Sequence, residues 1–356
     1  MTNTMPKIIR KTSPYLRRPN ANAPRMMRDV TIALLPATFF AIYSFGLPAL
    51  WIILTSIVSM LVTEYVFYQI QDLLQGESFK VINKQFSLYN FSAVTSGLIY
   101  GLTLPDQTPL WVVALSGVLG ILLAKLLFGG MGQNIFNPAA VARVLVVVNF
   151  ATLATYQTNI DGVAGATALS MNNADLFSAD VLNHYPIMDL FTGIGIPGSI
   201  GETSALLLLL GGGYLAVRTS FEIRIPLMYI GTVFVLALAV AIQQGLGLWY
   251  PLYHIFSGGL MLGAIYMATD PITSPITKPA RVYYGFALGV ITFIIRIFGA
   301  LPEGVVFSIL IMNMFVTSFD YYKVTHPRFN RKRSLIFIAI IILSIVVTLV
   351  GVSYAG

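Results

Sequence analysis

Runs of apolar residues, most of them long enough to cross a lipid bilayer, follow one another along nearly the whole chain, separated by short polar or Gly/Pro segments. A helix needs about 20 mostly apolar residues to span the hydrocarbon core. Hydrophobic residues make up 56% of the 356 residues, charged residues only 10%, and the mean hydropathy is +0.79. Ordinary soluble domains do not have this composition. The sequence therefore predicts an all-α integral membrane protein.

The apolar runs predict about 11 transmembrane helices. Their ranges are 29–47, 49–70, 88–104, 110–128, 138–155, 201–217, 225–243, 252–269, 282–298, 303–319 and 334–353. The segment 1–28 is basic but lacks the apolar region and cleavage site of a signal peptide, so we expect it to stay in the cytoplasm. An odd number of spans then places the C-terminus outside the cytoplasm.

The distribution of Lys and Arg indicates the same orientation. The longest predicted outward loop has no Lys or Arg from Val144 to Glu202, whereas basic residues cluster in the predicted cytoplasmic segment from Lys323 to Arg333. Cytoplasmic loops of membrane proteins carry an excess of these residues. The net charge of +7 therefore reflects membrane topology, and no nucleic-acid partner is expected.

A short glycine motif occurs twice. Gly97-Leu98 and Gly101 in the third predicted span recur as Gly259-Leu260 and Gly263 in the eighth. Because these spans run in opposite directions, the match predicts two inverted five-helix repeats plus one extra C-terminal helix. Glycine is common in membrane helices, so the match alone is explained equally well by chance. The predicted parts are a basic cytoplasmic segment (1–28), the first repeat (29–155), an extracytoplasmic loop (156–200), the second repeat (201–319), a basic cytoplasmic linker (320–333) and the extra helix (334–356).

The chain contains no cysteine, and its three histidines lie in separate segments. Thiolate-ligated iron–sulfur clusters and cysteine nucleophiles are therefore excluded within this chain. Any redox centre here has to be organic or His-ligated, and we expect neither a metal site nor a catalytic residue.

The predicted extracytoplasmic loop contains a segment of small residues, 161–170, that reads DGVAGATALS. Small residues leave the backbone unobstructed, so another enzyme could reach the Thr167 hydroxyl, as a covalent modification site requires. An ordinary surface loop is the commoner explanation of a bare Gly-Ala-Thr.

Asn137-Pro138 is typical of a helix start, with Asn137 as the N-cap and Pro138 at the first helical position. The glycine-rich stretch 129–132 before it permits a broken backbone inside a membrane protein. Free N–H groups at such a start can bind a phosphate or carbonyl of a cofactor, which makes Asn134 and Asn137 candidate cofactor ligands. A plain cytoplasmic turn is the alternative.

Glu64 lies inside the second predicted span, and Asp270 lies at the end of the eighth. Ionisable residues within spans are energetically expensive and often mark ion pathways, so both are ion pathway candidates. The alternatives are that Glu64 reaches the interface and that Asp270, beside Pro271, caps the end of its span.

Together these segments resemble the RnfD/NqrB family of membrane subunits over nearly the whole chain. The segment 161–170 is similar to the family's Asp-x-x-Ser-Gly-Ala-Thr flavinylation motif, although Ala164 replaces the commoner serine. The segment 125–139 resembles the family's Gly-Gly-x-Gly-x-Asn-x-x-Asn-Pro-Ala loop. Further matches are Thr269-Asp270-Pro271, 295–302 and 319–322. The short N-terminus and the Asp-Tyr-Tyr ending resemble the RnfD branch more than the NqrB branch.

In this family a transferase attaches FMN through its phosphate to the threonine hydroxyl. The resemblance therefore implies covalent FMN on Thr167, with Asp161, Gly165 and Ala166 as its recognition context, and a second, noncovalent flavin such as riboflavin.

The resemblance also implies a subunit of an Rnf-type translocase in a prokaryotic inner or plasma membrane. Such a complex couples electron transfer between ferredoxin and NAD to Na+ or H+ movement. The implied partners are Rnf subunits A, B, C, E and G, the FMN transferase during maturation, and the lipid membrane. No complete active site is expected in this chain alone.

Two other functions stay open at this point. Inverted repeats with broken helices also suit a channel or transporter without redox activity. A structural membrane anchor is the other possibility. Neither predicts a covalent flavin.

Overall fold

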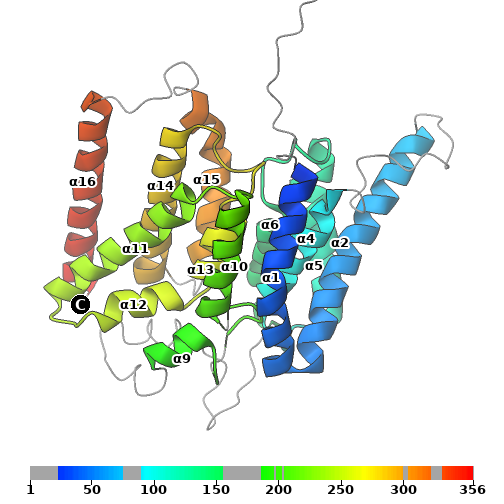
Figure 1. Ribbon diagram of the computed structural model, residues 1–356, viewed down its shortest axis with the longest axis horizontal. Helices are drawn as coiled ribbons and strands as arrows, with labels where there is room; N and C mark the ends of the chain where they lie inside the picture. The colour runs from blue at the N-terminus through cyan, green and yellow to red at the C-terminus, as the bar shows by residue number, and fades with distance from the viewer. Residues whose placement is uncertain are drawn as a thin grey trace, which may run out of the picture.

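The computed structural model describes residues 23–74, 90–154, 186–195, 198–202, 204–299, 304–321 and 331–355. Every regular element in these ranges is a helix. The predicted class, an all-α membrane protein, is therefore confirmed. Figure 1 shows the helices packed side by side, with the N-terminal and C-terminal halves of the chain forming neighbouring groups.

The first half contains five longer helices. They are α1 (Ala23–Phe45), α2 (Leu47–Leu74), α4 (Ser92–Leu102), α5 (Leu110–Ala124) and α6 (Pro138–Asn149). A short 3-10 helix, η1 (Leu126–Phe128), follows α5. α2 packs against α4 and α5, and α5 packs against α6.

The second half repeats this order of packing. Its elements are α9 (Ile187–Thr192), α10 (Ala205–Arg218), α11 (Arg224–Gln243), α12 (Trp249–Phe256), α13 (Leu260–Leu262), the π-helix η2 (Gly263–Met267), α14 (Lys278–Phe298) and α15 (Gly304–Tyr321). α11 packs against α12 and α14, and α14 packs against α15. α1 and α10 pack against each other and join the halves. One further helix, α16 (Arg331–Ala355), follows the second half.

Each of the eleven predicted spans overlaps at least one helix among the described residues, but these helices differ in length from the predicted spans. Within the part of the chain that the structure describes, six helices are long and apolar enough to cross a membrane, namely α1, α2, α5 with η1, α11, α14 and α16. The helices α4, α6, α10 and α15 are apolar but shorter. The eighth predicted span, 252–269, is not one helix but the broken series α12, α13 and η2. The number of complete crossings therefore stays a prediction.

A buried arginine, Arg296, forms hydrogen bonds with the backbone at the break between α12 and α13. Gly258 and Gly259 have φ of 65° and 67°, a conformation that glycine adopts without strain. The Arg296 guanidinium of α14 donates to the carbonyls of His254 (2.5 Å), Ser257 (3.0 Å) and Gly258 (2.9 Å). The backbone carbonyls at the end of α12 have no partner within the helix, and the Arg296 side chain supplies their hydrogen-bond donors.

The first glycines of the two copies of the motif have different structural roles, whereas Gly101 and Gly263 both lie at close contacts with a neighbouring helix, α2 and α15 respectively. A Cβ at Gly97 would lie 2.7 Å from the Ile57 Cα, so this glycine lets α4 approach α2 closely. Gly259 instead forms the backbone break, and Gly263 faces Val305 of α15. The two inverted repeats stay a prediction.

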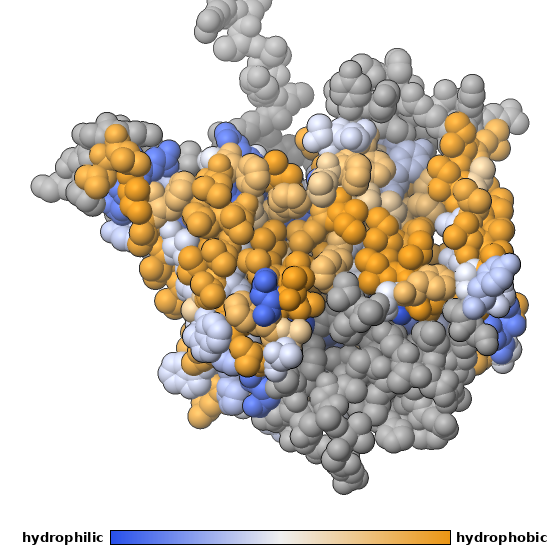
Figure 2. Space-filling view, turned by 180° about the vertical axis from the view of Figure 1, so that it is seen from behind, coloured by the Kyte–Doolittle hydropathy of each residue, from blue (hydrophilic) through white to orange (hydrophobic). Residues whose placement is uncertain are grey.

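The outer surface is apolar. On the face that Figure 2 shows, hydrophobic side chains form a broad band across the helices. α16 contributes strongly to the exposed apolar surface, because only 11% of its most apolar stretch is buried. Such a surface suits a hydrocarbon environment.

Candidate functional site

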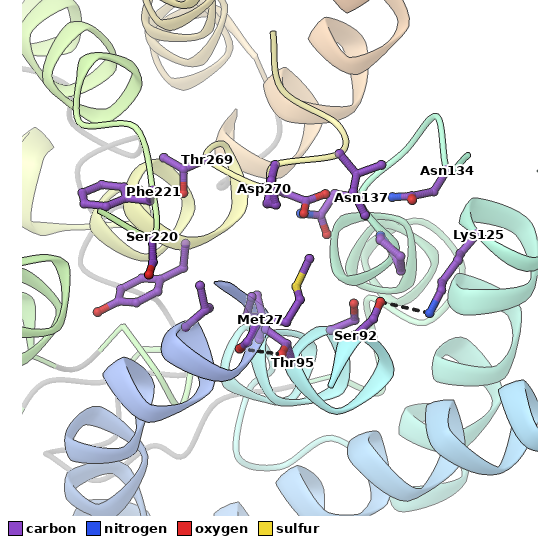
Figure 3. Close-up of a pocket in the computed structure, with 17 residues that line it drawn as sticks. Met27, Ser92, Thr95, Lys125, Asn134, Asn137, Ser220, Phe221, Thr269 and Asp270 are labelled. Carbon is purple, nitrogen blue, oxygen red and sulfur yellow. Dashed lines mark hydrogen bonds between the residues drawn. The ribbon is translucent and has the colours of Figure 1, made fainter. Parts of the chain in front are cut away.

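A cavity with both polar and apolar walls lies where the two halves of the bundle meet. Its walls come from α1, α4 and the start of α6 in the first half, and from the α10–α11 connection, η2 and residues 269–272 in the second (Figure 3). The space open to the centre of a water-sized sphere is about 30 Å³, enough for about two water molecules. Sites of transporters with repeated halves commonly lie at this kind of junction.

A buried ion pair borders the cavity. The Lys125 Nζ lies 2.6 Å from the Glu64 Oε1, and the two side chains are 1% and 0% exposed. The same Nζ donates to the Ser92 hydroxyl at 2.9 Å, a contact drawn in Figure 3. Lys125 and Ser92 line the cavity, while Glu64 stands behind Lys125 on α2. The ammonium therefore connects a membrane-embedded carboxylate to the cavity.

Breaks in regular structure position these side chains. Lys125 follows the last residue of α5, where the chain passes into η1 and then into glycines with positive φ. Ser92 begins α4 directly after Phe91, whose φ is 58°. The Asn90 Oδ1 accepts the Ser92 backbone N–H at 3.0 Å and stabilises this start. Glu64 lies in the continuous helix α2. Through Lys125, it connects the end of α5 and the start of α4 to this helix.

Asn137 is a helix cap, as predicted. Its Oδ1 accepts the N–H groups of Ala139 (3.0 Å) and Ala140 (3.4 Å). Its Nδ2 donates to the Met267 carbonyl of η2 at 3.2 Å, which links the two halves. The expected free N–H groups are thus partly used by the cap itself. Asn137 lines the cavity but has a clear structural role.

Asn134 is different. Its side chain lines the cavity and is 7% exposed, and the Oδ1 has no hydrogen-bond partner among the described residues. A buried carbonyl oxygen without a partner is costly. It is a ready acceptor for a ligand, an ion or a water in the cavity.

Asp270 also faces the cavity, next to Pro271 and Ile272. Its Oδ2 accepts the Thr273 hydroxyl at 2.9 Å. The Asp270 carboxylate therefore stabilises the turn that follows η2 and lies on the cavity wall, while its capping of the span end stays a prediction. Lys125 and Asp270 bring opposite charges to one cavity from different halves of the chain (Figure 3).

A second ion pair, near Ser220, joins the two halves of the bundle. The Asp29 carboxylate of α1 is 1% exposed, lies 3.1 Å from the Arg218 Nη2 of α10, and accepts the Ser220 hydroxyl at 2.5 Å. The sequence predictions did not single out Asp29 or Lys125. The only available signal was the rule that a carboxylate within a span needs a partner, and that rule does not name the partner.

The remaining predicted site residues, Thr167, Asp161, Gly165 and Ala166, lie outside the described residues. Of the predicted residues within the described part, the structure brings Asn134, Asn137 and Asp270 to one cavity. It connects Glu64 to the same cavity through Lys125.

Comparisons with known proteins point to one family. Residues 9–329 match the NQR2, RnfD, RnfE family. The D subunit of the Na(+)-translocating ferredoxin:NAD(+) oxidoreductase complex of Acetobacterium woodii is 37% identical over 307 residues, which cover 85% of this chain and 89% of that protein. The D subunit of the proton-translocating ferredoxin:NAD(+) oxidoreductase complex of Clostridium ljungdahlii is 35% identical over 338 residues, which cover 90% of this chain and 96% of that protein.

A third relative is the D subunit of the ion-translocating oxidoreductase complex of Stutzerimonas stutzeri, which is 35% identical over 339 residues. That match covers 85% of this chain and 91% of the relative. α16 begins at Arg331, beyond the end of the family match.

Proposed function

This chain belongs to the NQR2, RnfD, RnfE family, and from that premise we propose that it is the RnfD component of an Rnf-type complex. The complex would couple electron transfer between ferredoxin and NAD to ion movement across a prokaryotic cell membrane. Its partners would be Rnf subunits A, B, C, E and G. One relative belongs to a complex named as Na+-translocating and another to a complex named as proton-translocating. The ion that this complex transports would therefore be Na+ or H+.

The structural observation that carries the proposal is the buried Lys125–Glu64 pair beside the cavity between the halves. Two charges inside a membrane protein are expensive to keep and are usually functional. A cation or proton that enters the cavity meets the Asp270 carboxylate and the Asn134 Oδ1, and its charge acts on the Lys125 ammonium. We therefore place Glu64, Lys125 and Asp270 on the ion path.

The proposal includes FMN attached through its phosphate to the Thr167 hydroxyl. Its support is the sequence motif around Asp161, Gly165 and Ala166 and its position in a loop without Lys or Arg. An FMN transferase would install the flavin during maturation. The flavin would supply one-electron redox chemistry, while this chain retains and positions it.

A second, noncovalent flavin such as riboflavin belongs to the same proposal. The cavity has the polar groups that such a ligand needs, with the Asn134 Oδ1 as an acceptor and the Asn137 end of α6 nearby. Its volume of about 30 Å³ is too small for a flavin ring in this conformation. We therefore assign no electron-transfer step to a flavin inside it.

The proposed function also includes an orientation of the chain in the membrane. We place the N-terminus in the cytoplasm and the C-terminus and the Thr167 loop outside it, because the sequence of that loop has no Lys or Arg, whereas the segments predicted to face the cytoplasm are basic.

Flavin fluorescence of the denatured, purified chain tests this function against its two rivals. The chain should be made together with its partner subunits and the transferase, and separated under conditions that remove noncovalent cofactors. The proposal predicts a fluorescent band at the mass of this chain. A dark band from a correctly assembled complex would favour a non-redox transporter or a structural anchor.

A further inference from the structure

α16 contacts the rest of the bundle near both of its ends. Near its start, the Phe337 ring packs edge-on against Tyr283 and Phe286 of α14, with ring centroids 4.6 and 5.1 Å apart. Near its end, Gly351 lies against Phe298, since a Cβ there would be 2.6 Å from the Phe298 ring. α16 also contacts α11 at Leu349, whose carbonyl accepts the Gln243 Nε2 at 3.2 Å. Between Phe337 and Leu349 the helices leave a space.

The space forms a groove between α11, α14 and α16, with a volume of about 280 Å³. Its walls include Leu227, Val235, Phe286, Ile341 and Ile345. This volume is far larger than a single water needs, and the walls are apolar, so water does not solvate it favourably. An apolar occupant is required.

The two hydroxyl groups on the groove wall are already used. The Thr232 hydroxyl donates to the Met228 carbonyl at 2.7 Å, and the Ser344 hydroxyl donates to the Ile341 carbonyl at 2.8 Å. Neither hydroxyl needs a hydrogen bond from the occupant. A hydrocarbon chain meets this requirement better than a polar headgroup or a peptide backbone.

One end of the groove lies close to basic residues. Arg224 begins α11 one turn before Leu227, and its side chain is 41% exposed. Lys278 begins α14 and is also exposed. Arg224 and Arg281 share the Glu222 carboxylate. The Asp320 carboxylate accepts the Thr277 N–H beside Lys278 at 3.0 Å. Three cations thus face two carboxylates, and this rim keeps a net positive charge.

We propose that this groove is a lipid site that holds an acyl chain of an anionic phospholipid, with the phosphate at the basic rim. The acyl chain would fill the gap between α16 and the other helices, and arginine and lysine would bind the phosphate. The site depends on α16, which lies beyond the family match. It is independent of the flavin and ion proposals.

Photolabelling of the full-length chain in liposomes tests this site. The probe is an anionic phospholipid with a photoreactive group in its acyl chain, and a zwitterionic lipid with the same acyl chain is used in parallel. Labelled peptides are identified by mass spectrometry. We expect labels from the anionic probe on 227–235 of α11 and 341–345 of α16, and much weaker labelling by the zwitterionic probe.

Two glycine variants make the test specific. A Cβ at Gly231, which lines the groove, and a Cβ at Gly213, on α10, would both meet nothing within 4 Å. Gly231→Leu fills the groove and should remove most of the label, while Gly213→Leu should keep it. Equal labelling of both variants, or labels spread evenly over the apolar surface, would refute the site. Equal labelling by both lipids would refute the role of the basic rim.

Discussion

Replacement of Glu64 tests the buried ion pair most sharply. The Nζ–Oε1 distance of 2.6 Å gives a Coulomb attraction on the order of 6 kcal/mol at an effective dielectric constant of about 20. Desolvation of the two charges offsets much of this attraction, so the pair adds little net stability. Removal of one partner is different, because it leaves the other charge buried without its counterion. Glu64→Gln should therefore lower the free energy of unfolding by about 3–5 kcal/mol.

A double variant that removes both charges distinguishes the loss of stability caused by one unpaired charge from a loss of function. Glu64→Gln with Lys125→Gln removes both charges, and its stability should lie much closer to that of the wild type than the sum of the single variants predicts. Glu64→Asp keeps the charge and serves as the matched control. Stability is measured by denaturant unfolding of the purified chain in detergent micelles, followed by helix content. Additive effects of the single replacements would refute the pairing.

The same double variant tests the ion path. It should assemble with its partners and keep its flavin, yet move fewer ions for each electron transferred, as measured in vesicles with Na+ and proton carriers compared. Glu64→Gln alone is a poor test, because its loss of stability would reduce every activity. Unchanged ion movement in a stable double variant would assign the pair a purely structural role.

Two further predictions concern the cap and the topology. Asn137→Ala removes an N-cap and the bond to the Met267 carbonyl, so it should destabilise the protein by about 0.5–2 kcal/mol, while Asn137→Asp, which keeps the capping oxygen, should recover much of the loss in the same unfolding assay. A cysteine at Asn173, introduced into a chain that has none, should react with an impermeant thiol reagent in intact cells, and reaction only after membrane disruption would reverse the predicted orientation.

The sequence predicted the helices well because each span has its own local signal. Apolar runs placed α11 within one residue of its observed start, and Asn137-Pro138 marked the start of α6 correctly. These features depend on hydrophobicity and local capping, which act within a few residues.

Features that depend on contacts between distant segments were not predicted. The Lys125–Glu64 pair joins residues that are 61 positions apart, and Lys125 looked like an ordinary cytoplasmic charge in the sequence. The break at Gly258–Gly259 also escaped, because the Arg296 side chain that binds its carbonyls comes from another helix. Hydropathy does not show which side chain will satisfy a broken helix.

The most direct test of the central claim is a mass measurement on the loop peptide that contains Thr167. Protein made with its partners and the transferase should carry FMN on Thr167, and not on Ser170, Thr158 or Thr155. A hydroxyl is required for the phosphoester, so Thr167→Ala should lose the flavin while the chain stays folded in the membrane, since an exposed-loop replacement changes stability by less than about 0.5 kcal/mol. An unmodified loop peptide in the wild-type complex, or a flavin that persists in the alanine variant, would contradict the assignment of this chain as a flavin-carrying subunit at Thr167.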